Sequence, residues 1–502
     1  MTARTLMILG TSSSAGKSLI TTAFCHYYAS RGVSVAPFKA QNMSNNAAVC
    51  PDGGEIGRAQ AVQAKAAGLQ PTVDMNPVLI KPEADSRAQV IVRGKPWKSL
   101  QARDYYPVKE ELWAIVTRSL DKLREEYDLV IMEGAGSPAE LNLKENDIVN
   151  MAVARYARAP VFLVGDIDRG GIFAQLLGTH WLLPPGEQKL VKGFLVNKFR
   201  GDSSLFTDGI TILEAKGGVP VVGVMPYHHD LQIPEEDSVA LENLAPVSIA
   251  FHEKVDIAVI HLPLISNFDD FDPLAREPNL QVRYVRHPGQ LGDPAAVIIP
   301  GTKSTIKDLI WLQETGWAKS IRDYAQAGGH VVGICGGYQM LGKEVRDPEG
   351  VESDHRQRQG LGLLSIETAF LEKKDTYQAR AVVADGPRWL DTADPGLLSG
   401  YEIHMGKTSG KTGWLTIVER SGREVEVPDG AVSEDGRIWG TYLHGLFANE
   451  GFRRAWLESL GWKAPAGEVA GRDPFQASLQ ELTISLEKNL DMEYVEKVIW
   501  ER

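Results

Sequence analysis

The sequence predicts an α/β protein with two domains, each built on a parallel β-sheet. Three observations lead to this prediction. The chain has 502 residues, more than one hydrophobic core usually organises. Short, continuously apolar segments alternate with helix-like stretches in both halves, which is typical of a parallel sheet covered on both faces. An acidic, proline-containing segment at residues 227–252 interrupts this alternation. We therefore place domains at 1–240 and 252–450, followed by a helical extension at 451–502.

The composition excludes several classes of protein. Hydrophobic residues make up 43% of the chain and charged residues 24%, as in a folded globular protein. The net charge of −12 opposes binding to nucleic acid or to anionic membranes. The three cysteines form no C-x-x-C pair, so we expect neither a disulfide framework nor a cysteine metal site. Because we find no secretion signal and no apolar run long enough to span a membrane, we expect a cytoplasmic protein.

Each predicted strand of the two sheets is a short apolar run. In the first half the runs are at residues 6–10, 33–38, 128–134, 159–168, 193–199 and 221–226. In the second half they are at residues 255–263, 282–287, 295–301 and 330–337. The later part of the second half, residues 362–447, is rich in strand-forming residues, so we expect further β-structure there.

A glycine-rich loop, "GTSSSAGKS", joins the first predicted strand to a helix that starts near Lys17. Backbone N–H groups of such a loop bind phosphate oxygens, a lysine adds positive charge, and the hydroxyl of Ser18 can ligate Mg²⁺. The usual pattern, G-x-x-x-x-G-K-[ST], is met at Gly16 but has Thr11 in place of its first glycine. The alternative is a turn that only caps the helix. The strand-loop-helix context favours a nucleotide site.

This variant loop resembles that of dethiobiotin synthetase and its relatives, which use ATP to activate carboxyl or carbamate groups. Glu133 ends a buried strand, at the sheet edge where α/β proteins bind ligands, and we expect it to ligate Mg²⁺. The resemblance also implies Glu55 as a metal ligand and Asn197 as the residue that contacts adenine. A solvated glutamate at a helix start is the alternative for Glu55.

In the second half, Cys335 lies in a G-x-C-x-G turn between an apolar strand and a helix. Such a turn exposes a nucleophile above the sheet, and the N–H of Gly336 can donate to an oxyanion. The alternative is an inert buried cysteine. Of the two histidines late in this domain we choose His444 over His404 as the base, because His444 follows an apolar strand and precedes a glycine. The strand end at Gly301 can supply a second oxyanion donor.

These segments resemble, in order, the class I glutamine amidotransferase domain, in which a Cys-His pair hydrolyses glutamine and releases ammonia. That family usually has a glutamate two residues after the histidine, where this chain has Leu446. Glu402 is the nearest candidate to orient the base. The alternative is a Cys-His dyad without a third member.

The two halves together resemble the cobyric acid synthase family, over roughly residues 5–450. Strings such as "FKAQNMSNNA" (38–47), "MEGAGSPAELNL", "SNFDDFDPL" (266–274) and "YLHGLF" carry this resemblance. No physical reason for 38–47 and 266–274 emerges from the sequence. The resemblance implies amidation of the b, d, e and g carboxylates of a corrinoid, adenosylcobyrinic acid a,c-diamide, with ATP, Mg²⁺ and glutamine as the ammonia donor.

Two other functions remain open at this stage. One is the related ligase that amidates the a and c carboxylates. The other is a P-loop switch ATPase whose amidotransferase domain no longer catalyses a reaction. The sequence leaves the oligomeric state open.

Overall fold

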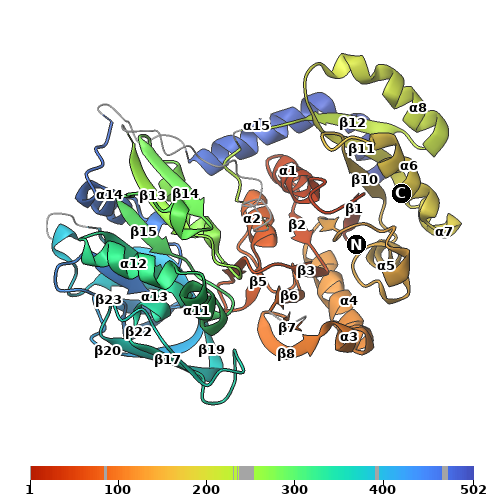
Figure 1. The fold of residues 1–502 in the computed structure, drawn as a ribbon. Helices are drawn as coiled ribbons and strands as arrows, with labels where there is room; N and C mark the ends of the chain where they lie inside the picture. Colours follow the sequence, from red (N-terminus) through yellow and green to blue (C-terminus); the bar gives the residue numbers. More distant parts are fainter. Residues whose placement is uncertain are drawn as a thin grey trace.

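The first domain is built on a six-stranded parallel sheet (Figure 1). The computed structural model describes residues 2–83, 87–229, 231–234, 236, 254–390, 395–465 and 473–501. The strand order is β12-β11-β10-β1-β9-β2, and all five pairings are parallel. The strands are β1 (Arg4–Gly10), β2 (Val35–Phe38), β9 (Leu129–Glu133), β10 (Val161–Asp166), β11 (Val191–Phe199) and β12 (Val221–Pro226). The predicted strands and their parallel arrangement are confirmed.

Helices cover both faces of this sheet, which explains why its strands are continuously apolar. In β1, Leu6 and Ile8 join the core on one face, and Met7 and Leu9 join the core on the other. The main helices are α1 (Lys17–Ala29), α2 (Arg58–Ala66), α4 (Lys109–Glu126), α5 (Met151–Ala157), α6 (Ile172–Leu182) and α8 (Thr207–Gly217).

An insertion between β2 and α4 lies against the second domain, and the sequence analysis did not predict it. It contains the sheet β3 (Gln41–Met43), β6 (Val78–Pro82), β7 (Arg87–Val92) and β8 (Lys95–Gln101), and the hairpin β4 (Ala47–Val49) with β5 (Glu55–Gly57). Its side chains Ala47, Val49, Leu79 and Ile91 form one buried cluster with Tyr401 and Ile403 of the second domain. Apolar packing therefore joins the two domains at this point.

The second domain has a mainly parallel sheet of order β14-β13-β15-β16-β24-β23, whose last pairing is antiparallel. Its parallel strands are β13 (Val255–Ile260), β14 (Leu280–Val285), β15 (Ala296–Ile299), β16 (His330–Ile334) and β24 (Ile438–Thr441). Three helices pack on it: α11 (Thr305–Glu314), α12 (Trp317–Gln326) and α13 (Gly336–Leu341).

The predicted β-rich part forms a second, mostly antiparallel sheet in this domain. It centres on the long hairpin β19 (Ile366–Val383) and β20 (Leu398–Gly410), extended by β21 (Leu415–Arg420) and β22 (Arg423–Asp429).

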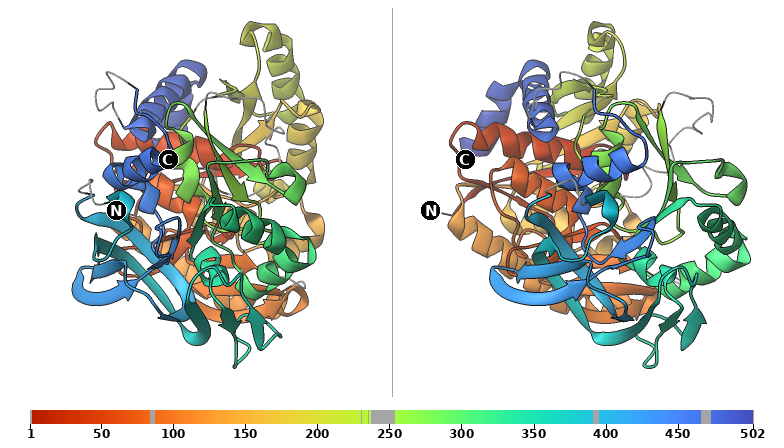
Figure 2. Two further views of the ribbon diagram at one scale, coloured as in Figure 1. Left: turned by 60° about the vertical axis from the view of Figure 1, so that its left-hand side comes forward. Right: turned by 90° about the vertical axis from the view of Figure 1, so that its left-hand side faces the viewer.

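The C-terminal extension is divided between the two cores. Helix α14 (Glu450–Ser459) places Phe452 and Trp456 in the core of the second domain. Helices α15 (Pro474–Asn489) and α16 (Met492–Trp500) return to the first domain, where Leu479 and Leu486 pack in the core that includes α1. Figure 2 shows these helices beside α1. The C-terminal helices thereby connect the end of the chain to its beginning.

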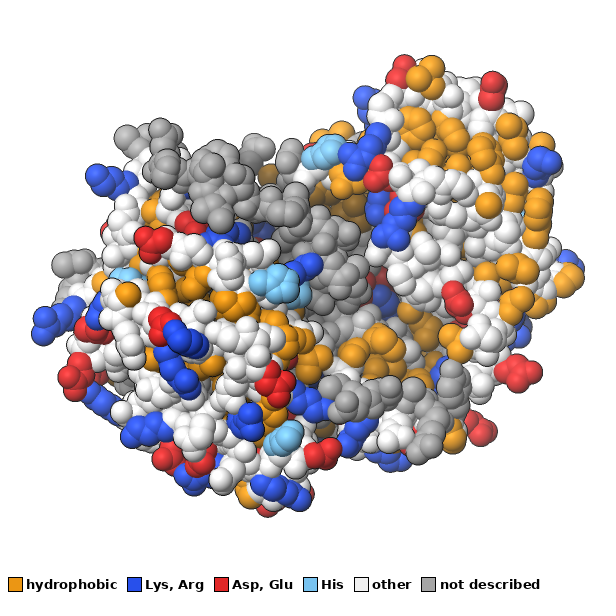
Figure 3. Space-filling view, viewed as in Figure 1, with side chains coloured by type: hydrophobic (Ala, Val, Ile, Leu, Met, Phe, Trp, Pro, Cys, Tyr) orange, Lys and Arg blue, Asp and Glu red, His pale blue; other side chains and the backbone are white. Residues whose placement is uncertain are grey.

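Positive and negative side chains are interspersed over the face of the molecule in Figure 3. Among the described residues, no helix is both long and apolar enough to cross a membrane.

Candidate active sites

Cys335 occupies a strained turn between β16 and α13. Its backbone has φ 51° and ψ −108°, a combination that a residue with a side chain rarely adopts. The flanking glycines make this turn possible, since a Cβ on Gly337 would lie 1.9 Å from the carbonyl oxygen of Ile299. The G-x-C-x-G pattern therefore forms the expected turn, with the thiol at the carboxyl edge of the sheet.

His444 and Cys335 line the same pocket, of about 60 Å³, and the partner of the histidine is Asp270. His444 Nδ1 lies 2.6 Å from Asp270 Oδ2, and the Gly445 N–H donates to Asp270 Oδ1 at 2.8 Å. Burial lowers the pKa of His444, but Asp270 and Cys335 outweigh burial and raise it to about 10. Cys335, His444 and Asp270 thus form a Cys-His-Asp series. Their roles as nucleophile, base and orienting acid stay a prediction.

The expectation that Glu402 orients His444 is wrong. Both carboxylate oxygens of Glu402 accept hydrogen bonds from Arg420, at 2.7 and 2.6 Å, so this acid is neutralised within the β19–β22 sheet. Asp270 was missed because it lies 174 residues from His444 in the sequence. The acidic string at 266–274 was the available signal, but nothing in it indicates which carboxylate faces the histidine.

The two turns proposed to bind an oxyanion adjoin each other. A Cβ on Gly301 would lie 3.0 Å from His444 Cε1, and a Cβ on Gly336 would lie 2.6 Å from Thr302 Cγ2. Both glycines thus lie at the Cys335 pocket. The use of their N–H groups as oxyanion donors stays a prediction.

The phosphate loop follows β1 directly, and α1 begins at Lys17. Gly16 has φ 99°, and a Cβ there would lie 2.0 Å from Asn197 Nδ2, so a side chain is excluded. Lys17 Nζ donates to the carbonyls of Ser12 and Gly136, at 2.8 and 3.2 Å. The lysine therefore bridges the loop and the segment after β9. This is the position expected of a lysine that holds a phosphate bound to the loop.

Thr11 and Asn197, the other two residues predicted to bind the nucleotide, make hydrogen bonds that support the phosphate loop. The Thr11 hydroxyl donates to Gln175 Oε1 at 3.1 Å. Asn197 is buried, and its amide donates to the carbonyl of Ala15 at 2.9 Å. Its role in contacting adenine stays a prediction.

Ser18 and Glu133 come together as expected, with the serine hydroxyl 2.8 Å from Glu133 Oε1. Two residues that the sequence analysis missed complete this cluster. Lys39, just after β2, lies 2.9 Å from Glu133 and 2.6 Å from Glu236, and Ser18 also donates to Glu236 at 2.9 Å. On the other side, Gln63 of α2 donates to Glu133 Oε2 at 2.6 Å.

Glu55 does not belong to this cluster, contrary to expectation. It is fully buried and pairs with Lys81 and with Lys374 of the second domain. Burial raises the pKa of Glu55, but the two lysines outweigh burial and lower it to about 2. The structure assigns Glu55 an ion-pairing role between the domains, because the β4–β5 hairpin directs it toward the second domain.

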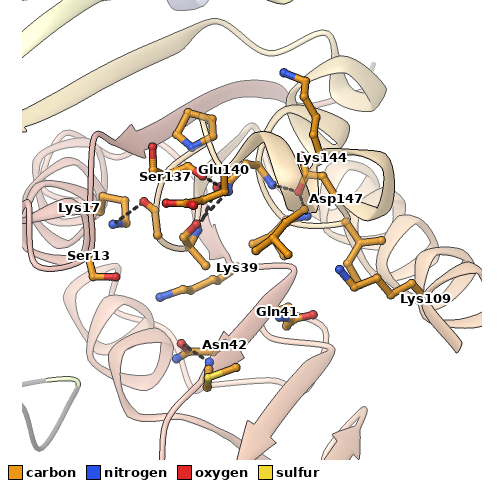
Figure 4. A pocket seen from close by; sticks show the side chains of 18 of the residues that line it. Ser13, Lys17, Lys39, Gln41, Asn42, Lys109, Ser137, Glu140, Lys144 and Asp147 are labelled. Carbon is orange, nitrogen blue, oxygen red and sulfur yellow. Dashed lines mark hydrogen bonds between the residues drawn. The ribbon is translucent and has the colours of Figure 1, made fainter. Parts of the chain in front are cut away.

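A cavity of about 410 Å³ opens beside the phosphate loop. Figure 4 shows Lys17, Lys39 and Lys109 around it, together with Asn42 and Ser137. Glu140, Asp147 and Glu236 also line the cavity, so it presents both lysines and carboxylates next to the phosphate loop.

Comparisons with known proteins agree with this arrangement. Residues 6–240 match the family described as the CobQ/CobB/MinD/ParA nucleotide binding domain. Residues 256–452 match the CobB/CobQ-like glutamine amidotransferase domain. The fold and the two sites define a glutamine-dependent amide ligase with a nucleotide-binding domain.

Relatives that match nearly the whole chain narrow this class to one family. The cobyric acid synthase of Chloroflexus aurantiacus is 55% identical over 489 residues, which cover 97% of this chain and 98% of the relative. That of Roseiflexus castenholzii is 54% identical over 489 residues, with the same coverage. That of Herpetosiphon aurantiacus is 50% identical over 490 residues, with 98% of both chains covered. The chain belongs to the cobyric acid synthase family.

Proposed function

We propose that this chain catalyses the reaction of cobyric acid synthases: glutamine- and ATP-dependent amidation of the b, d, e and g carboxylates of adenosylcobyrinic acid a,c-diamide. The observation that carries the proposal is the presence, in one chain, of a Cys-His-Asp series and a phosphate loop beside a cavity lined by lysines and acids. A carboxylate is a poor electrophile and ammonia is mostly protonated at neutral pH. Amide formation therefore needs both activation of the acid and local release of ammonia.

In the glutaminase half, His444 takes the proton of Cys335, and the sulfur attacks the side-chain amide of glutamine. Asp270 holds Nδ1 of His444, which leaves Nε2 to exchange the proton. The N–H groups of Gly301 and Gly336 stabilise the tetrahedral oxyanion. His444 then protonates the leaving ammonia, and water releases glutamate from the thioester.

In the ligase half, the loop from Thr11 to Ser18 and Lys17 bind the phosphates of ATP, and Asn197 contacts the adenine. Mg²⁺ usually combines one or two carboxylates with substrate phosphates and water. The Ser18 hydroxyl and the Glu133 and Glu236 carboxylates, 2.8 and 2.9 Å from Ser18, offer such a donor set. When bound, Mg²⁺ neutralises charge on the transferred phosphoryl group.

The acceptor carboxylate enters the cavity beside the phosphate loop, near Lys39 and Lys109. Its oxygen attacks the γ-phosphorus of ATP, which releases ADP and gives an acyl phosphate. Ammonia then attacks the acyl carbon, and inorganic phosphate leaves with the oxygen that came from the acid. Each amide thus consumes one ATP and one glutamine.

Mass spectrometry of the diamide incubated with glutamine and MgATP tests this function. We expect a product in which four carboxyl groups have become amides, and no change without ATP. An unchanged diamide, together with amidation of cobyrinic acid at only two positions in a parallel incubation, would instead indicate the a,c-diamide ligase. Absence of any product and of glutamine hydrolysis would contradict the proposal and revive the switch ATPase.

A further inference from the structure

The base of the glutaminase site is held on two sides. Tyr401 stacks on the ring of His444, with centroids 5.1 Å apart and planes inclined by 12°. The two residues also exchange backbone hydrogen bonds of 3.1 and 2.9 Å. On the other side, Asp270 holds Nδ1 of His444, and Asp269 precedes it in the chain. A group that fixes both Tyr401 and Asp269 therefore also fixes the base.

Arg58 of the first domain contacts both residues from the N-terminus of α2. Its Nε lies 3.0 Å from Asp269 Oδ2, and its Nη2 donates to the Tyr401 hydroxyl at 2.7 Å. The side chains of Arg58 and Asp269 are only 15% and 12% exposed, so water screens this contact little. A planar guanidinium with several donors can serve two partners at once, whereas an ammonium offers a single point of charge.

The charge of Arg58 also matters to the base. Asp269 and Asp270 are neighbouring buried carboxylates, and two such groups oppose each other's ionisation. Burial raises the pKa of Asp269, and Arg58 acts against this rise. The guanidinium thus offsets the negative charge that Asp269 places next to Asp270 and His444.

A second set of hydrogen bonds between the domains also ends at Tyr401. The N–H of Asn267 donates to Asn46 Oδ1 at 2.7 Å, and its side chain donates to the Ala47 carbonyl at 2.9 Å and to the Tyr401 hydroxyl at 2.6 Å. Asn46, Ala47 and Asn267 belong to the segments 38–47 and 266–274, whose physical role was not evident from the sequence. The two segments form the contact between the ligase domain and the Cys-His-Asp series of the second domain.

We propose that Arg58, a residue of the ligase domain, is a positioning residue of the glutaminase: it fixes His444 through Tyr401 and through Asp269 and Asp270. Glutamine hydrolysis then depends on docking of the two domains. The inference rests on the proposed function, because it assumes that Cys335 hydrolyses glutamine.

Three variants of the full-length chain test this role: Arg58→Ala, Arg58→Lys and the control Gln378→Ala. Gln378 also bridges the domains, since its amide donates to the Val49 carbonyl, but it is not among the residues that line the Cys335 pocket. The measurements are kcat and KM for glutamine hydrolysis with corrinoid and MgATP present, and the rate of amidation with ammonium salts in place of glutamine.

For Arg58→Ala we expect a kcat for glutamine hydrolysis lower by about 10- to 100-fold, with little change in KM, because a displaced base slows the reaction without altering glutamine contacts. Ammonium-supported amidation should stay within about two-fold of wild type. Arg58→Lys should recover part of the kcat, and Gln378→Ala should leave it unchanged.

A wild-type kcat in Arg58→Ala would overturn the inference. So would an equal loss in Gln378→Ala or in ammonium-supported amidation, because either would reduce Arg58 to a general structural role. If Arg58→Ala does not fold, wild-type kcat and KM in Arg58→Lys would overturn it instead. Failure of the wild-type chain to hydrolyse glutamine would contradict the proposed function itself, which separates the two failures.

Discussion

The two active sites lie at equivalent edges of two parallel sheets, but their charged groups are arranged differently. In the glutaminase site, Cys335, His444 and Asp270 already form the series that the reaction needs. In the ligase site, Lys17 donates to backbone carbonyls, and Lys39 lies between the carboxylates of Glu133 and Glu236.

This difference reflects what each site must do. A covalent reaction by a side chain needs a preorganised nucleophile and base, and strain at Cys335 is tolerated for that purpose. A phosphoryl-transfer site acts through positioning and charge, so its charges neutralise one another until MgATP provides new partners. We therefore expect MgATP to compete with the contacts that Lys39 makes with Glu133 and Glu236.

The substitution with the largest expected effect, Cys335→Ser, should separate the activity of the glutaminase site from that of the ligase site. Cys335→Ser should lower glutamine-supported amidation by about 10⁴-fold or more, since the thiolate is the attacking group. Amidation with ammonium salts should continue at the wild-type rate, as measured by product mass. Loss of both activities would show that the sites do not divide the work in this way.

Asp270→Asn tests the preorganisation of the glutaminase site. The exchange should lower kcat for glutamine hydrolysis by about 10² to 10⁴-fold, because the amide no longer stabilises the protonated, correctly oriented His444. Glu402→Gln is the matched control and should have a small effect on this kcat, since Glu402 accepts a hydrogen bond from Arg420 and, among the residues that the structure describes, forms none with His444. A larger loss in the Glu402 variant would reverse the assignment. Both are measured by glutamate release.

Lys17→Ala tests the ligase site. Removal of this charge should lower amidation by about 10² to 10³-fold with either glutamine or ammonium, because both routes need the activated carboxylate. Product mass and ADP release provide the measurement. Normal ADP release in this variant would place the nucleotide elsewhere.

The smallest expected effect concerns stability and pH. Asp270 and Cys335 together outweigh burial and raise the pKa of folded His444 to about 10, above its unfolded value near 6.5. A raised histidine pKa stabilises the fold fully below the unfolded value, and this stabilisation is lost as the pH rises toward 10. The difference in unfolding free energy between wild type and Asp270→Asn should thus be larger at pH 6 than at pH 10, by a change on the order of a few kcal/mol. Urea unfolding at both pH values measures it, and an equal or growing difference would contradict the pairing.

Much of the molecule could be predicted from local sequence. The parallel strands follow from continuous apolar runs, and the turns at Gly16 and Cys335 follow from glycines whose Cβ atoms would collide with the neighbouring chain. The insertion at residues 41–101 was missed because its strands are short and partly exposed. Glu55 was misplaced because it lies in this insertion, whose direction no local pattern indicates.

The sequence by itself determined the turn that carries Cys335 and the loop that is predicted to bind phosphate, since the backbone geometry of each depends on a few adjacent residues. Only the tertiary structure decided which distant side chains complete them: Asp270 rather than Glu402 beside His444, and Lys39 and Glu236 rather than Glu55 beside Ser18. Several acids follow strands or lie in loops of similar composition, and a carboxylate acts on whichever partner the packing places within hydrogen-bonding distance. That distance is set by the fold of each domain and, for Glu55 and Lys374, by the docking of the two domains. No spacing along the chain indicates it.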